Sequence, residues 1–138
     1  MSQLVRIRPR GTAQRRGAAA VELAICLPLL VLLVMASIEA CTMIFLDHSL
    51  TIASYEGVRA GINYDGTNAD VLARANAIVN SRDIKDAKVT LNPPDVASAE
   101  RGQTIAVTVS APCNANMIIP PWFYDGRTLR ATMTMVKE

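Results

Sequence analysis

At residues 15–38 the chain reads RRGAAAVELAICLPLLVLLVMASI. The part from Ala18 to Ile38 is 21 residues long and has one charge, the carboxylate of Glu22. An α-helix rises about 1.5 Å per residue, so about 20 apolar residues cross the roughly 30 Å hydrocarbon layer of a bilayer. The stretch therefore predicts one transmembrane helix, residues 18–38, whose side chains contact membrane lipid.

Charge is distributed unequally on the two sides of this helix. Five arginines and no acidic residue precede Ala18, whereas the chain from Ala18 on has nine basic and twelve acidic residues. Because arginines near a spanning helix keep their flank in the cytoplasm, we predict a cytoplasmic basic leader, residues 1–17, and an extracytoplasmic C-terminal part. The leader has no apolar periodicity and is expected to be unstructured. No aromatic platform accompanies the arginines, so nucleic-acid binding is not expected.

Glu22 is an unusual residue for a spanning helix. An ionised carboxylate in lipid is costly and normally has a positively charged partner. Cutting the chain after Gly17 would create an α-amino group on Ala18 and leave Glu22 as the fifth residue of the new chain. Two alternatives leave Glu22 unexplained: a secreted small binding domain whose signal peptide is removed near Ser37, and an uncleaved single-pass membrane scaffold.

The pattern of a glycine, a run of small residues and a glutamate at the fifth place resembles the processing site of type IV pilins and pseudopilins. Together with EGVR at residues 56–59 and a β-rich end closing on LRATMTMVKE, it resembles the TadE-like pseudopilins of tight-adherence (Tad/Flp) pilus systems. The resemblance implies a subunit of the bacterial inner membrane that a prepilin peptidase cuts between Gly17 and Ala18. It further implies that Glu22 neutralises the amino terminus of a neighbouring subunit during assembly.

The resemblance also implies which partners the chain has. They are the prepilin peptidase, other pilins or pseudopilins and the pilus assembly platform, and the processed chain is expected in the inner membrane or in the pilus filament. Pro28 lies inside the spanning helix, where it removes one backbone hydrogen bond. It predicts either a flexible point used in assembly or a simple kink.

After Ile38 the continuous apolar pattern becomes amphipathic. Residues at spacings of three and four share one helical face: Cys41, Phe45, His48, Ile52, Tyr55, Arg59 and Ile62. We predict an amphipathic stalk helix over residues 39–63. An apolar face on such a helix needs a cover, and we expect the chain's own C-terminal domain to supply it, with a neighbouring subunit as the alternative.

The remaining residues, 64–138, predict one small α+β domain of the pilin-like kind. A second helix is expected over residues 70–81, capped by Thr67 or Asn68. Three runs have strand character and predict a three-stranded antiparallel sheet packed on the helices: residues 88–91, 104–111 and 128–136.

The sequence contains no catalytic or metal-binding constellation. His48 is the one histidine, and no Cys-x-x-Cys motif is present, so we expect neither an enzyme nor a bound cofactor or metal. Glu56 and Arg59 lie one helical turn apart, which favours a helix-to-domain contact or a self-association site. Cys41 and Cys113 both fall in the extracytoplasmic part and are candidates for a disulfide.

Half of the aromatic residues gather in MIIPPWFY, residues 117–124. One interpretation is that this segment fills the gap between sheet and stalk. The other is a partner surface or a foot at the membrane interface, where Trp and Tyr are favoured.

Overall fold

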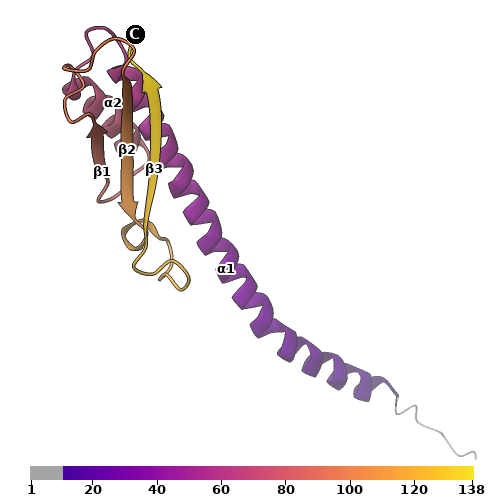
Figure 1. Ribbon diagram of the computed structural model, residues 1–138. Helices are drawn as coiled ribbons and strands as arrows, with labels where there is room; N and C mark the ends of the chain where they lie inside the picture. The colour runs from indigo at the N-terminus through magenta and orange to yellow at the C-terminus, as the bar shows by residue number, and fades with distance from the viewer. Residues whose placement is uncertain (1–10) are drawn as a thin grey trace, which may run out of the picture. The chain divides into compact units, whose positions relative to one another are not determined.

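The computed structural model describes residues 11–138, with side chains from Gly17 on. It divides into two compact units, which meet between Ser37 and Ile38. The fold is α+β, as predicted: a long N-terminal helix, a second helix and a three-stranded antiparallel sheet (Figure 1). The elements are α1 (Gly11–Gly61), α2 (Asn68–Ser81), β1 (Lys88–Asn92), β2 (Thr104–Pro112), the 3-10 helix η1 (Asn114–Asn116) and β3 (Thr128–Val136).

Helix α1 begins at Gly11, seven residues before the predicted start at Ala18. The expectation of an unstructured leader is therefore wrong for residues 11–17, while residues 1–10 lie outside the described part of the chain. Residues 12–16, TAQRR, contain no proline, and extending an existing helix costs far less free energy than starting one. The helix also continues through Pro28 without interruption.

Helix α2 begins with the capping box that its sequence encodes. The backbone N–H of Asp70 donates to Thr67 Oγ1 at 3.3 Å, and the backbone N–H of Thr67 donates to Asp70 Oδ2 at 3.1 Å. The bonds from Thr67 lower the pKa of Asp70. Thr67 is thus the predicted cap, although the helix starts two residues earlier than expected. Asn68 instead fixes the loop after β1, because its side chain bonds Pro94 O and the N–H of Val96.

The sheet has the order β1-β2-β3, with both neighbouring pairs antiparallel. Each strand lies within one residue of its predicted bounds, whereas η1 was not predicted. Along β2, side chains alternate between the two faces, and Ile105, Val107 and Val109 are fully buried. Figure 1 shows both helices on one side of the sheet, so these residues point at the helices. The other face is polar and includes a hydroxyl pair, Thr108 and Thr132, at 2.7 Å.

The face of α1 that enters this core is not the predicted one. Of the predicted face, Ile62 packs partly against the core. The buried apolar side chains of α1 include Met43, Leu46, Leu50, Ala53 and Val58, whereas the other six predicted residues stay exposed: Cys41, Phe45, His48, Ile52, Tyr55 and Arg59. The expectation that the C-terminal domain covers the second set is therefore wrong. Apart from the step of five from Ala53 to Val58, both sets recur at spacings of three and four, so spacing alone did not distinguish them.

Small residues explain why α2 and the sheet pack against the other face of α1. A Cβ atom added to Gly57 would lie 3.3 Å from Ala75 Cβ on α2 and 3.3 Å from Val107 Cγ1 on β2. One added to Gly61 would lie 2.9 Å from Val71 Cγ2, closer than real Cβ atoms approach. The glycines of the EGVRAG segment therefore let α2 and β2 reach the α1 backbone, which the bulkier opposite face does not permit.

The C-terminal residues close the domain at the end of α1. The N–H of Glu138 donates to Ile62 O at 3.0 Å, and Lys137, which is buried, donates from Nζ to Val96 O at 2.7 Å. The residues after β3 are thereby tied to the residue that follows α1 and to the β1–β2 loop.

Candidate functional site

The first candidate site is the start of the apolar helix. Gly17, Ala18 and Glu22 are all exposed, and no residue in the part of the chain with described side chains pairs with the Glu22 carboxylate. A Cβ atom added to Gly17 would meet nothing within 4 Å. Packing inside this chain therefore explains neither the glycine nor the glutamate.

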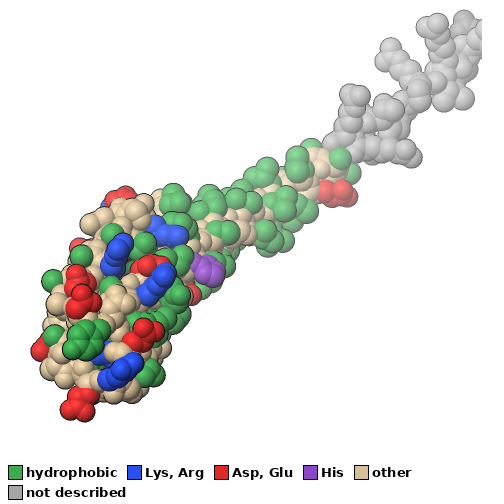
Figure 2. Space-filling view, turned by 90° about the horizontal axis from the view of Figure 1, so that it is seen from above, with side chains coloured by type: hydrophobic (Ala, Val, Ile, Leu, Met, Phe, Trp, Pro, Cys, Tyr) green, Lys and Arg blue, Asp and Glu red, His purple; other side chains and the backbone are tan. Residues whose placement is uncertain are grey.

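The rest of that helix has the character of a membrane span. It is long and apolar enough to cross a bilayer, and none of its most apolar window is buried. Figure 2 shows hydrophobic side chains over this part of α1, with one acidic group near its start. Pro28 lies among these side chains and has no N–H to donate to the preceding turn, so the span lacks one backbone hydrogen bond there.

A second candidate is the uncovered face of α1 in the folded unit, which we call the exposed stripe: Cys41, Ile44, Phe45, His48, Ile52 and Tyr55. Ile44 is 57% exposed and Phe45 is 53% exposed. Arg82 lies over the Phe45 ring at 5.8 Å and donates to Ser49 Oγ at 3.2 Å, which marks one border of the stripe. Figure 2 shows the single histidine at the surface beside hydrophobic side chains. None of the described residues covers this stripe.

Glu56 and Arg59 line an open polar cavity of about 550 Å³, together with Asp70 and Arg74 of α2. Glu56 is half-buried and Arg59 is exposed. The contact between helix and domain at this point is made by the two residues between them, because Gly57 and Val58 are buried. Glu56 and Arg59 flank this contact, and their predicted roles in a helix-to-domain contact or in self-association stay predictions.

The three cysteines are free, and the Cys41–Cys113 disulfide is not formed in this structure. Cys41 lies on the exposed stripe, whereas Cys113 is fully buried at the end of β2, where its N–H donates to Arg127 O at 2.8 Å. Burial raises the pKa of Cys113, so its thiol stays protonated and unreactive. Cys26 is exposed on the apolar helix.

Sequence reasoning missed Glu39, which has the most elaborate contacts of any carboxylate in the described residues. Its side chain is only 3% exposed. Its Oε1 accepts three backbone hydrogen bonds, from Trp122 at 3.0 Å, Phe123 at 2.8 Å and Tyr124 at 3.0 Å. Burial raises the pKa of Glu39, but the three N–H donors together outweigh it, and the net pKa is lowered. Glu39 thus holds the β2–β3 loop against α1.

A signal for this role existed in the sequence. Glu39 precedes Met43 by four residues and Leu46 by seven, so it lies on the buried face of α1. A carboxylate on a buried face needs hydrogen-bond donors, and the loop backbone supplies them.

The segment at residues 117–124 has two kinds of side chain. Met117 and Tyr124 pack partly against the core, as the gap-filling interpretation predicts. Ile118, Trp122 and Phe123 do not, since they are 81%, 72% and 63% exposed.

These observations define a membrane-anchored protein with one N-terminal apolar helix and a small α+β unit. The family model described as TadE-like protein matches residues 17–59, which span α1 from Gly17 to Arg59. Over these residues the match confirms the resemblance to TadE-like proteins that the sequence showed. No curated protein and no solved structure matches the chain.

Proposed function

We propose that the chain is a pseudopilin, a minor pilin-like subunit, that a prepilin peptidase cuts between Gly17 and Ala18. The observation that carries the proposal is the exposed Glu22 at the fifth position after Gly17, on an apolar stretch of helix. Among the residues with described side chains it has no charged partner. The family match begins at Gly17 itself. The exposed position of that glycine also leaves the peptide bond accessible to a peptidase.

Cleavage would change the electrostatics of the helix start. It removes the arginines of the leader and creates an ammonium group on Ala18 in the same region as the Glu22 carboxylate. Either charge alone is costly in hydrocarbon, whereas a pair between neighbouring subunits neutralises both. The pairing therefore favours association of processed helices over isolated ones, and this is the proposed mechanism of assembly.

The same proposal assigns the location and the partners. The protein spans the bacterial inner membrane once, with its N-terminus cytoplasmic and its α+β unit extracytoplasmic. The other pilins or pseudopilins and the assembly platform meet the span and the exposed stripe, whose side chains find no cover in the described chain. We assign it a structural and not a catalytic role, because the one histidine belongs to this stripe and not to a group of potential catalytic residues.

The N-terminus of the protein from native membranes tests the cleavage step. Mass spectrometry is expected to find a chain that begins at Ala18. A start near Ser37 would instead indicate a secreted domain, and an intact leader would indicate an uncleaved scaffold, and either result contradicts the proposal. Gly17→Leu is expected to block cleavage, whereas the matched leader change Gly11→Leu is expected to leave it intact.

Glu22→Ala tests the assembly step separately. Cleavage is expected to continue, because the scissile bond is unchanged, while co-assembly with other pilins is lost along with the charge pair. Glu100→Ala, which removes an exposed carboxylate from the folded unit, is the control and is expected to assemble normally. Normal assembly of the Glu22→Ala protein would disprove the pairing mechanism.

A further inference from the structure

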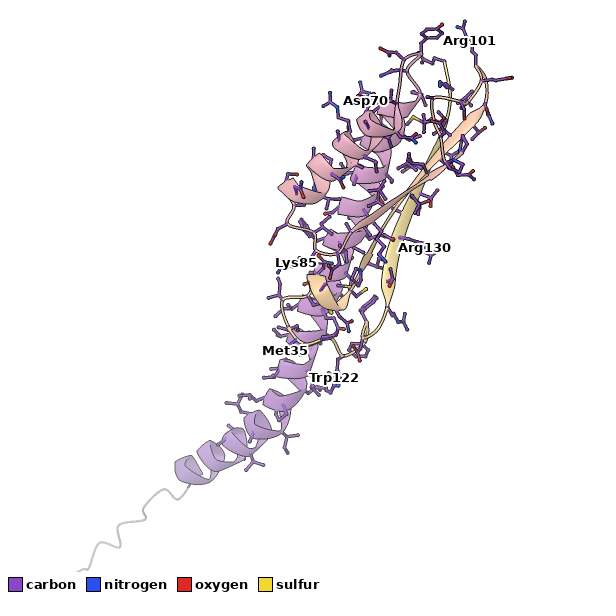
Figure 3. All side chains as sticks on the ribbon, turned by 90° about the vertical axis from the view of Figure 1, so that its left-hand side faces the viewer. Met35, Asp70, Lys85, Arg101, Trp122 and Arg130 are labelled. Carbon is purple, nitrogen blue, oxygen red and sulfur yellow. The ribbon has the colours of Figure 1, made fainter. Side chains whose placement is uncertain are left out.

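The loop between β2 and β3 exposes large apolar side chains at one end of the folded unit. Residues 117–124, the aromatic loop, carry no charge. Ile118, Trp122 and Phe123 are more than half exposed, and the rings of Trp122 and Phe123 lie 6.3 Å apart. Figure 3 shows Trp122 at the end of the sheet opposite Arg101 and Asp70. Such a cluster marks a contact surface.

The position of the aromatic loop along the chain identifies what it contacts. Glu39, which holds the loop, is the first charged residue after Glu22, and residues 23–38 between them have no charge. The first charge after a long apolar run lies where the hydrocarbon layer ends. The loop is therefore bonded to the turn of α1 that leaves the membrane.

The backbone of the loop is prepared for a region with little water. Three consecutive N–H groups, from Trp122 to Tyr124, donate to one carboxylate oxygen of Glu39. Backbone donors that enter a membrane interface must find partners within the protein, and these three already have one. The same bonds compensate the negative charge, so that neither partner needs bulk water.

We propose that the aromatic loop is a membrane foot: Ile118, Trp122 and Phe123 insert into the interfacial layer of the bilayer that α1 spans, and Glu39 clamps the loop in place. Trp at the head-group level buries its ring in the acyl boundary and keeps its N–H hydrated. The inference goes beyond the proposed function, because it depends on neither leader cleavage nor assembly into a pilus.

Trp122 is the only tryptophan of the chain, so its fluorescence tests the proposal directly. The full-length protein is reconstituted in vesicles of phosphatidylcholine and phosphatidylglycerol whose acyl chains carry bromine either near the glycerol or near the chain end. We expect blue-shifted emission and stronger quenching by bromine near the glycerol. Emission that responds only to aqueous acrylamide would overturn the proposal. A blue shift without any lipid quenching would also overturn it, because burial in another protein would then be the cause.

Three variants test whether the lipid quenching comes from the position of the aromatic loop. Trp122→Phe combined with Tyr64→Trp moves the fluorophore to a residue that is 91% exposed beyond the C-terminal end of α1. From Glu39 to Gly61 α1 rises about 33 Å, so lipid quenching is expected to disappear. Glu39→Ala is expected to abolish most quenching of Trp122 by releasing the loop. Phe123→Ser alters only an exposed side chain and is expected to weaken quenching with the fold intact by circular dichroism. Unchanged quenching in Phe123→Ser would contradict insertion even if Glu39→Ala fails to fold.

Discussion

Two faces of α1 in the folded unit have similar residue spacing, but one face is buried and the other is exposed. The buried stripe consists of Glu39, Met43, Leu46, Leu50, Ala53, Gly57 and Gly61, and the exposed stripe contains the residues from Cys41 to Tyr55 defined above. Apart from the adjacent Ile44 and Phe45, both repeat every three or four residues, and the aromatic side chains, Phe45 and Tyr55, lie on the exposed one. The domain therefore packs on the face of α1 whose backbone it can approach closely, and here that is the face that ends in glycines.

The consequence for the proposed function is that the bulkier stripe stays available to other molecules. Once α2 and β2 have packed against Gly57 and Gly61, the opposite side of α1 is out of reach of the domain. The core of the folded unit and the proposed contact surface therefore use two sides of one helix.

The largest expected effect is a difference in stability between substitutions on the buried face and on the exposed face of α1. Leu50 is fully buried, so Leu50→Ala is expected to lower the free energy of unfolding by about 2–5 kcal/mol, as cavity-forming changes do. Ile44→Ala, on the exposed stripe, is expected to change it by roughly 0.5 kcal/mol or less. Urea unfolding of the full chain in detergent, followed by circular dichroism, measures both. Equal losses would mean that both faces are covered.

A second experiment tests whether close approach selects the buried face. Gly61→Ala places Cβ 2.9 Å from Val71 Cγ2 and is expected to cost about 1–3 kcal/mol through overpacking. Gly57→Ala makes contacts of 3.3 Å, and the gain in helix propensity of about 1 kcal/mol offsets the crowding. Its net change is expected to be near zero. A stabilised Gly61→Ala protein in the same unfolding experiment would contradict the packing argument.

The sequence predicted most of the fold and less of the site. Apolar run length gave the spanning helix, alternation gave the strands, and Thr67 marked the start of α2, because these signals are local. The choice between the two faces of α1 depends on contacts with residues far along the chain, such as Val71 and Val107. The clamp at Glu39 was missed for the same reason, since its donors lie 83 to 85 residues away.

The pH dependence of stability tests the polar end of the buried stripe. The pKa of Glu39 is lowered from its ordinary value of 4.5 in the folded state, so its ionised form stabilises the fold above that value. This contribution is lost as the pH falls through the folded pKa. Glu39→Gln is therefore expected to destabilise the protein at pH 7, and the difference from the unmodified chain is expected to shrink as the pH falls below about 4.5. Asp70 titrates in both proteins and cancels. A difference that is constant from pH 7 to pH 3 would mean that the charge of Glu39 plays no part.

The smallest expected effect on stability belongs to the exposed stripe, and it is paired with a loss of association. Ile44→Ser combined with Tyr55→Ser is expected to change the free energy of unfolding by less than about 1 kcal/mol, because neither side chain reaches the core. Cys41 lies on the same stripe and has an exposed thiol, so a bismaleimide added to native membranes is expected to link it to a neighbouring protein, in a Cys26→Ala background. If the stripe is the surface on which other pilins pack, the two serines will abolish these adducts while the unfolding transition stays in place. Adducts that persist would show that Cys41 meets its neighbours by chance, and the unoccupied face of α1 would then have no role in assembly.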